Sequence, residues 1–340
     1  MGSHRYPWRW WLRDLPSPEP GAPTVFSTFA CGGGSSMGYK LAGFDVVGNC
    51  ELDPRMAATY AANLHPGLSY VEDIREFALR EDYPEELMSL DVLDGSPPCT
   101  SFSTVGNREA DWGKVKRFAE GQAEQRLDDL FLSFLDVVGR LRPKCFVAEN
   151  VPGMLRGNAK GYVSEILSEA QGLGYSVQLF RLNSASMGVP QARERVFFIG
   201  NRMGWPKLRL EFAEEPILFG EVRGDAPGKS LPPSVARIVG MSRPFENGCR
   251  TTLVHNGSAP NMFGHTYCWD EKPSPTRTAQ CSQIRMCDRT LVSDEDMVSV
   301  QTFPQDYDFR GQSVSYVTGM SVPPVMMANV AHEIREQWLS

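Results

Sequence analysis

The sequence predicts an α/β protein in which helices cover both faces of a mostly parallel sheet and a smaller, irregular module interrupts the chain. Two observations support this fold class. From Thr24 to Gly200, short apolar runs alternate with helical patterns, an order typical of parallel sheets. Over residues 201–288 the alternation stops, and Pro, Gly, Ser and Arg are frequent without a sustained helical period. We therefore expect a β- and loop-rich domain in that segment.

Composition narrows the class of protein. The chain has 340 residues, 34 Lys and Arg against 41 Asp and Glu, and no apolar run of the roughly 18 residues that a membrane span needs. The start of the chain is interrupted by Arg9, Arg13 and several prolines, so it does not resemble a signal peptide. The eight cysteines form no Cys-x-x-Cys pair, which argues against a disulfide framework or a structural metal site. We expect a cytoplasmic protein that uses neither membrane nor metal.

The elements follow in order along the chain. Residues 1–23, with Trp8, Trp10 and Trp11, show no periodicity and are interpreted as an N-terminal arm, with a loosely packed tail as the simpler reading. An α/β domain follows over 24–200, then the irregular module over 201–288, and a segment over 289–340 that completes the α/β domain. Strands are expected over 25–30, 46–50, 90–94, 145–149, 177–182 and 196–200, and helices over 37–42, 54–63, 127–141, 162–173, 293–302 and 324–339.

A glycine-rich turn follows the first strand. Glycines at 32–34 allow the backbone to approach a ligand closely, but the segment matches neither a P-loop nor G-x-G-x-x-G. Glu51 ends the second strand about 20 residues later, where a carboxylate can hold the hydroxyls of a ribose. Asp73 can bind an adenine amino group. These residues indicate a cofactor that contains adenosine without pyrophosphate; the alternative is a tight turn with solvated acids.

Two further strands end in residues suited to chemistry. Pro97 and Pro98 fix the backbone before Cys99, which places a thiol at the carboxyl edge of the sheet, where open α/β folds bind ligands. Glu149 ends an apolar strand, where a partly buried carboxyl can donate or share a proton. Gln191-x-Arg193-x-Arg195 places two guanidinium groups on one side of an extended segment, although such pairs are more often surface ion pairs.

In their order and spacing these motifs resemble the C5-cytosine DNA methyltransferases. Three residues depart from the usual pattern of that family: Cys31 replaces a common glycine, Thr100 a common glutamine, and Met320 a common asparagine. The resemblance covers about 25–200 and 291–339. The matching segments are residues 29–34, Pro97-Pro98-Cys99 with Phe102-Ser103, Glu149-Asn150-Val151, Gln191-x-Arg193-x-Arg195, Phe303-Pro304 with Tyr307, and Gly319-x-x-Val322-Pro323-Pro324.

The resemblance implies a Rossmann-like domain that binds S-adenosylmethionine, with a target-recognition domain at 201–288. It implies that Cys99 attacks C6 of a flipped-out cytosine, that Glu149 binds the N3/N4 edge and Arg195 binds O2, and that Arg193 positions Glu149 or the Cys99 loop. The cofactor residues that it implies are Phe29, Ala30, Gly32, Gly33, Gly34, Glu51, Leu52, Asp73, Ile74, Leu130, Ser321 and Val322.

Duplex DNA is the implied substrate, and a monomer is expected. The sequence leaves open whether a cognate restriction endonuclease accompanies the enzyme. Two alternatives remain, namely a tRNA methyltransferase of the same fold and a DNA-binding scaffold without catalysis. The large insert favours duplex DNA over tRNA, and the intact Cys99, Glu149 and Arg195 argue against a silent scaffold. The residues expected to contact substrate are Pro98, Ser103, Asn150, Gln191, Arg237, Arg243, Arg250, Arg277 and Arg285.

Overall fold

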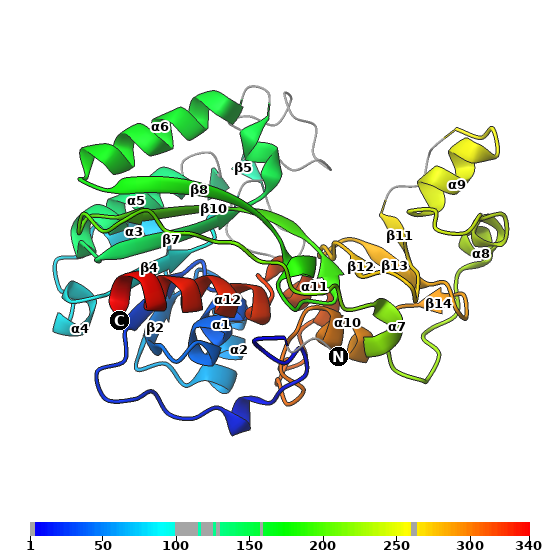
Figure 1. The fold of residues 1–340 in the computed structure, drawn as a ribbon, viewed down its shortest axis with the longest axis horizontal. Helices are drawn as coiled ribbons and strands as arrows, with labels where there is room; N and C mark the ends of the chain where they lie inside the picture. The colour runs from blue at the N-terminus through cyan, green and yellow to red at the C-terminus, as the bar shows by residue number, and fades with distance from the viewer. Residues whose placement is uncertain (1–3, 99–114, 117–124, 127–129, 157–158, 260–263) are drawn as a thin grey trace. The chain divides into compact units, whose positions relative to one another are not determined.

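The computed structural model describes residues 4–98, 115–116, 125–126, 130–156, 159–259 and 264–340 (Figure 1). The chain divides into two compact units. The sheet unit contains Pro16–Leu182, Glu194–Glu211 and Val330–Ser340. The insert unit contains Met1–Leu15, Asn183–Arg193 and Phe212–Asn329.

A seven-stranded sheet forms the centre of the sheet unit, in the order β3-β2-β1-β4-β7-β10-β8. The pairs that join β3, β2, β1, β4 and β7 are parallel, whereas β10 is antiparallel to β7. The carboxyl ends of the five parallel strands and the amino end of β10 therefore meet at one edge. This confirms the predicted sheet. Its strands are β1 (Thr24–Thr28), β2 (Asp45–Cys50), β3 (Leu68–Tyr70), β4 (Val92–Gly95), β7 (Cys145–Asn150), β8 (Ser176–Asn183) and β10 (Glu194–Asn201).

Helices cover both faces of this sheet, as Figure 1 shows. α1 (Gly34–Leu41) and α2 (Pro54–Leu64) lie on one face, and α3 (Ile74–Ala78), α5 (Leu130–Leu141) and α6 (Ala159–Gly172) on the other. α2 begins as its sequence predicts, because the Asp53 carboxylate accepts the N–H of Arg55 at 2.9 Å and Pro54 occupies the first turn. The unit also contains α4 (Glu85–Met88), the pair β5 (Val115–Lys116) and β6 (Gln125–Arg126), the 3₁₀ turn Pro152–Leu155 and the π-turn Arg335–Leu339.

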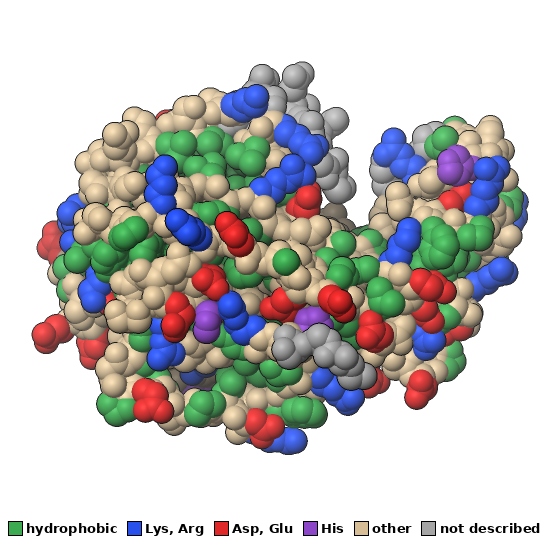
Figure 2. Space-filling view, viewed as in Figure 1, with side chains coloured by type: hydrophobic (Ala, Val, Ile, Leu, Met, Phe, Trp, Pro, Cys, Tyr) green, Lys and Arg blue, Asp and Glu red, His purple; other side chains and the backbone are tan. Residues whose placement is uncertain are grey.

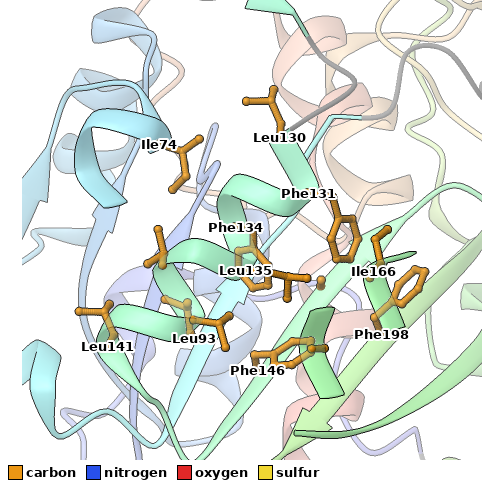
Figure 3. Packing of buried hydrophobic residues seen from close by; sticks show 14 of the residues in the cluster. Ile74, Leu93, Leu130, Phe131, Phe134, Leu135, Leu141, Phe146, Ile166 and Phe198 are labelled. Carbon is orange, nitrogen blue, oxygen red and sulfur yellow. The ribbon is translucent and has the colours of Figure 1, made fainter. Parts of the chain in front are cut away.

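Aromatic packing between α5 and the sheet holds the strands in place (Figure 3). The ring of Phe131 packs on Phe198 of β10 with centroids 5.0 Å apart, and Phe134 packs on Phe146 of β7 at 5.9 Å. All four side chains are at most 2% exposed, and burying each contributes about 1.5–3 kcal/mol. The ends of β7 and β10 therefore lie on a rigid base.

The insert unit combines short strands with short helices. The sheet β11-β13-β14 and the pair β9-β12 fit the expected β-rich module. The helices α7, α8 and α9 were not expected, because two turns are too short to show a clear period in the sequence. The strands are β9 (Gln191–Ala192), β11 (His265–Cys268), β12 (Ser274–Pro275), β13 (Ser282–Arg285) and β14 (Thr290–Leu291), and the helices are α7 (Phe219–Val222), α8 (Pro233–Gly240), α9 (Cys249–His255), α10 (Asp294–Val300) and α11 (Val314–Met320), with 3₁₀ turns at Leu12–Asp14 and Ser184–Ser186.

The segment interpreted as an arm packs within the insert unit. Trp10 is 5% exposed and donates its indole N–H to the carbonyl of Thr302 at 2.9 Å, and the N–H of Leu12 donates to Asp306 at 2.7 Å. This part of the chain is therefore not a loose tail. The segment 289–340, expected to complete the α/β domain, is divided between the two units. The boundary falls after Asn329, inside α12 (Pro324–Ile334). None of the described helices is both long and apolar enough to span a bilayer.

Candidate active site

The loop after β1 makes a tight turn at the carboxyl edge of the sheet. Phe29, Cys31 and Gly33 all have positive φ, at 51°, 44° and 81°. Gly33 precedes α1, and a Cβ atom there would lie 2.5 Å from Cδ1 of Leu64. A non-glycine residue with positive φ is uncommon, and two in one short loop indicate a backbone shaped for close contact with a ligand.

Glu51 joins this loop to the loop after β2. Its side chain accepts the N–H of Cys31 at 2.7 Å and the N–H of Asp53 at 2.9 Å, one on each carboxylate oxygen. Burial raises the pKa of Glu51, and these two N–H groups partly offset that effect. Each oxygen of a carboxylate has two lone pairs, so both can accept a further hydrogen bond from ribose hydroxyls. The two carboxylate oxygens of Glu51 are therefore suited to accept hydrogen bonds from the ribose of an adenosine cofactor.

The remaining cofactor candidates fall into three groups. Ile74 and Leu130 are buried members of the large hydrophobic cluster of the sheet unit, and the partly buried Phe29 packs against the same cluster. Asp73 accepts the N–H of Arg75 at 2.8 Å and begins α3. Ala30 and Gly32 lie in the turn after β1, and Gly34 is the first residue of α1. Leu52 follows Glu51, and Ser321 and Val322 are buried in the insert unit.

Glu149 and Arg195 form an ion pair at the same edge of the sheet. Glu149 is paired in register with Phe197 of the antiparallel β10, and Arg195, two residues earlier, projects from the same face. Nε of Arg195 lies 2.7 Å from Oε1 of Glu149, and each side chain is 11% exposed. Burial lowers the pKa of Arg195, and the charge of Glu149 partly offsets this. The antiparallel direction of β10 brings these residues together.

The segment before Cys99, the candidate nucleophile, is held by Asn150, the last residue of β7. Asn150 donates its side-chain N–H to the carbonyl of Pro97 at 3.0 Å and accepts the N–H of Val151 at 2.8 Å. Pro98 is half-buried. Cys99 lies outside the described residues, as does Ser103. Asn150, expected to contact substrate, thus fastens the chain two residues before Cys99.

A buried acid that sequence reasoning missed lies beneath this edge. Asp94 of β4 is 2% exposed, and Tyr39 of α1 lies 3.5 Å from Oδ1. Burial raises the pKa of Asp94 to about 7, and the charge of Glu149 acts in the same direction, while hydrogen bonds from Ser27, Ser35 and Tyr39 oppose the shift. An aspartate inside the apolar run before Gly95 is a signal that could have identified it.

The predicted functional residues Gln191, Arg193 and Arg277 lie in the interior of the insert unit. Gln191 donates to Gln301 at 2.7 Å and accepts the N–H of Arg277 at 2.9 Å. The guanidinium of Arg193 donates to the carbonyls of Arg277 and Gly319, at 2.6 and 3.4 Å. Arg193 therefore fastens backbone segments of its own unit. Its role in positioning Glu149 or the Cys99 loop stays a prediction.

The recognition arginines separate into two groups. Arg277 and Arg285 are 0% and 1% exposed; Arg277 donates to Thr318, Gln283 and Ser315, and Arg285 contacts Asp288 and Asp296. Their burial assigns both to the protein interior rather than to a surface that faces DNA, which corrects the expectation from sequence. Arg237, Arg243 and Arg250 are exposed. No group of side chains within the described part of the chain could hold a metal ion.

Known proteins resemble this chain over most of its length. The crystal structures of DNMT2 from Spodoptera frugiperda, a mutant form, and of Dnmt2 from S. pombe share its fold, with TM-scores of 0.65 and 0.64 at 13% and 14% identity, over 92% of this chain and 99% of theirs. The type II methyltransferase M.NgoPII of Neisseria gonorrhoeae is 37% identical over 91% of this chain and 93% of its own length, and M1.HphI of Haemophilus parahaemolyticus is 26% identical over 92% and 86%.

The family of C-5 cytosine-specific DNA methylases matches residues 24–218. This match includes the loop after β1, Glu51, the Pro97-Pro98 segment and the Glu149–Arg195 pair. Together with the similarity to M.NgoPII, it fixes the enzyme class and the methyl donor. The chain belongs to the C-5 cytosine-specific DNA methylase family and is a sequence-specific DNA (cytosine-5-)-methyltransferase that uses S-adenosyl-L-methionine.

Proposed function

We propose that Cys99, Glu149 and Arg195 carry the chemistry of this methyltransferase. The observation that supports the proposal best is the buried Glu149–Arg195 pair, 2.7 Å between Nε and Oε1, at the sheet edge where the Pro97-Pro98 segment leads to Cys99. A carboxyl and a guanidinium side by side can bind the N3/N4 edge and O2 of one cytosine. The ion pair fixes their spacing before the base arrives, which is the preorganisation that catalysis requires.

Cytosine C5 is too weak a nucleophile to take a methyl group directly. The Cys99 thiolate attacks C6 and forms an S–C6 bond, and the ring electrons move toward C5. Glu149 stabilises the electron-rich ring by sharing a proton at N3. Glu51, Asp73 and the loop at residues 29–34 would hold S-adenosyl-L-methionine, which would supply the methyl group to C5 and leave as S-adenosyl-L-homocysteine. A base then removes the proton from C5, the electron pair re-forms the C5–C6 double bond, and Cys99 leaves as thiolate.

The target cytosine reaches this pocket by flipping out of the duplex, since its C5 and C6 atoms are otherwise stacked between neighbouring bases. Unstacking costs a few kcal/mol, which contacts in the pocket offset. Sequence recognition is assigned to residues 201–288. Residues 201–290 carry 12 Lys and Arg against 9 Asp and Glu. The exposed Arg237, Arg243 and Arg250 are the candidates for contact with phosphates or bases.

The biological setting is part of the proposal. Similarity to type II methyltransferases supports a role beside a cognate restriction endonuclease, although the enzyme itself acts as a monomer. The cytoplasm is the proposed location, because the DNA substrate lies there. The seven cysteines in the described part of the chain are all free thiols, which fits a reducing compartment.

Transfer of a tritiated methyl group tests the proposal. Wild-type enzyme and Cys99→Ser are incubated with labelled S-adenosyl-L-methionine and either plasmid DNA or a tRNA pool, and the plasmid is then sequenced after bisulfite treatment. We expect label in DNA alone, at C5 of cytosine in one sequence context, and none with the serine variant although it binds both ligands. Label in tRNA, or transfer by Cys99→Ser within tenfold of wild type, contradicts the proposal.

A further inference from the structure

The part of the insert unit around α8 and α9 has a surface charge of one sign. Residues 226–269, here called the α8–α9 lobe, contain a single carboxylate, Glu246, which is 6% exposed and paired internally. The outer face of the lobe is therefore positive. Figure 2 shows Lys and Arg side chains, in blue, over this part of the surface. Such a surface is complementary to a polyanion such as DNA. Its exposed basic residues are Lys229, Arg237, Arg243 and Arg250.

Phe245 projects from this positive surface in a strained conformation. Its side chain is 48% exposed, and its φ is 64°. For a bulky residue this left-handed backbone is strained, and such outliers gather at functional sites. Single exposed apolar residues are ordinary, but an exposed ring on a strained backbone beside Arg243 is not. The conformation favours presentation of the ring to a ligand over its burial.

A rigid support lies behind the ring. Trp269 packs against Phe245 with centroids 5.5 Å apart and donates its indole N–H to the carbonyl of Glu246 at 2.8 Å. The Glu246 carboxylate accepts the hydroxyl of Thr252 at 2.5 Å and lies 2.7 Å from Nδ1 of His255, so it fastens the turn to α9 from inside. The ring is thus preorganised, and little side-chain entropy remains to be lost on binding.

A cation also lies over this ring. Nζ of Lys272 is 4.8 Å from the centroid of Phe245. A phosphate can attract that ammonium group while the free edge of the ring contacts an apolar base edge, for example the methyl group of thymine. The aromatic ring and its basic neighbours therefore supply both kinds of contact found in sequence-specific DNA-binding proteins. Contacts to the DNA phosphates position the protein, and the contact to a base provides discrimination.

We propose that Phe245 is a specificity-determining residue whose ring contacts a base pair in or next to the methylated sequence of duplex DNA. The inference rests on the proposed recognition role of residues 201–288 and identifies one contact within it. It concerns the insert unit alone and does not depend on the chemistry assigned to Cys99 and Glu149.

The test compares Phe245→Gly with Val254→Ala in the full-length enzyme. Glycine removes the ring and tolerates positive φ, so the variant should fold, whereas Val254, 52% exposed on α9, is a matched apolar control in the same lobe. Methylation rates are measured by bisulfite sequencing on a plasmid library randomised at and around the target site. We expect Phe245→Gly to lose at least about tenfold in kcat/KM on the preferred sequence and to flatten the preference at one position. Val254→Ala should stay within about twofold of wild type.

Parallel measurements with Arg243→Ala separate the Phe245 contact from the wider recognition role of residues 201–288. Loss of a phosphate contact should weaken methylation of all sequences alike and reduce the salt dependence by about one charge. If the Arg237, Arg243 and Arg250 variants change binding or preference but Phe245→Gly retains both rate and preference, the Phe245 contact is refuted and the recognition role of 201–288 stands. If the arginine variants and Phe245→Gly all behave as wild type, the recognition role itself fails.

Discussion

Nε of Arg195 lies 2.7 Å from Oε1 of Glu149, across the only antiparallel pairing made by β7 among the described strands. Both groups are largely removed from water, so breaking the pair would leave a buried charge without its counter-ion. The pair stands where the carboxyl ends of the parallel strands converge. The pairing of β7 with β10 thus brings together two residues that are 46 apart in the sequence.

Glu149→Gln should lower turnover on the order of 10²–10⁴-fold, because glutamine cannot share a proton with N3 of cytosine. The amide keeps the shape of the side chain, so the affinity for S-adenosyl-L-methionine should change little. Single-turnover methylation and calorimetric titration with the cofactor measure the two effects. A folded variant with wild-type turnover would remove Glu149 from the chemistry, and a variant that fails to fold would make its role structural.

Glu51→Gln should weaken cofactor binding by roughly 10- to 100-fold, the range expected for loss of hydrogen bonds to a charged acceptor. Calorimetry with S-adenosyl-L-methionine provides the measurement. Glu72→Gln is the matched control, since Glu72 pairs with Arg80 outside the predicted cofactor set. Equal affinities for Glu51→Gln and wild type would show that Glu51 only joins the two loops through Cys31 and Asp53.

Asp94 should make stability depend on pH. Its carboxyl is protonated more readily in the folded enzyme, with a pKa of about 7, than in the unfolded chain. The folded state therefore binds more protons between about pH 4 and pH 7, and its stability falls as the pH rises through that window. The Asp94→Asn side chain cannot titrate. The free energy of unfolding of this variant should therefore rise relative to that of wild type by up to about 4 kcal/mol between pH 4 and pH 8. Urea unfolding of both proteins across this range measures the difference, and parallel curves would contradict it.

Arginine-to-alanine variants should separate recognition from folding. Among Arg237, Arg243 and Arg250, loss of a base contact should relax one position of the methylated sequence, at about 1–3 kcal/mol, whereas loss of a phosphate contact should weaken all sequences alike. Arg277→Ala should lower the thermal midpoint without changing the preference, because that side chain is buried and hydrogen bonded to Thr318, Gln283 and Ser315. Methylome sequencing detects the changes. Wild-type rates and an unchanged motif in all three exposed variants and in Phe245→Gly would place recognition outside 201–288.

Most of the fold of the sheet unit was predictable because its longer strands and helices have local signals, whereas the short β3, α3 and α4 were not predicted. Apolar runs predicted β7 and β10, and the Asp53-Pro54 pair predicted the start of α2. The direction of β10 was not predictable, since it depends on the connection through residues 183–193, which belong to the other unit. That direction places Arg195 beside Glu149.

The place of Glu149 near the end of a buried strand was predictable from the apolar run before it, and its catalytic role stays a prediction. The place of the arginine side chains was less predictable, because the sequence does not distinguish an exposed guanidinium from a buried one. Arg193, Arg277 and Arg285 were assigned to function from their spacing or charge, yet they donate to protein atoms in the interior. Asp94 was missed because its importance depends on Tyr39 and Ser27, which are distant in sequence and reach it only in the folded sheet.

Covalent trapping with 5-fluorocytosine tests the central claim most directly. Fluorine cannot leave C5 as a cation, so once Cys99 has attacked C6 and the methyl group has arrived, elimination is blocked and the enzyme stays attached to its substrate. We predict a complex with duplex DNA that survives denaturation, requires both S-adenosyl-L-methionine and Cys99, and is absent with fluorinated tRNA. Trapping on tRNA alone, or none on a genomic DNA pool while cofactor is bound, would contradict the account.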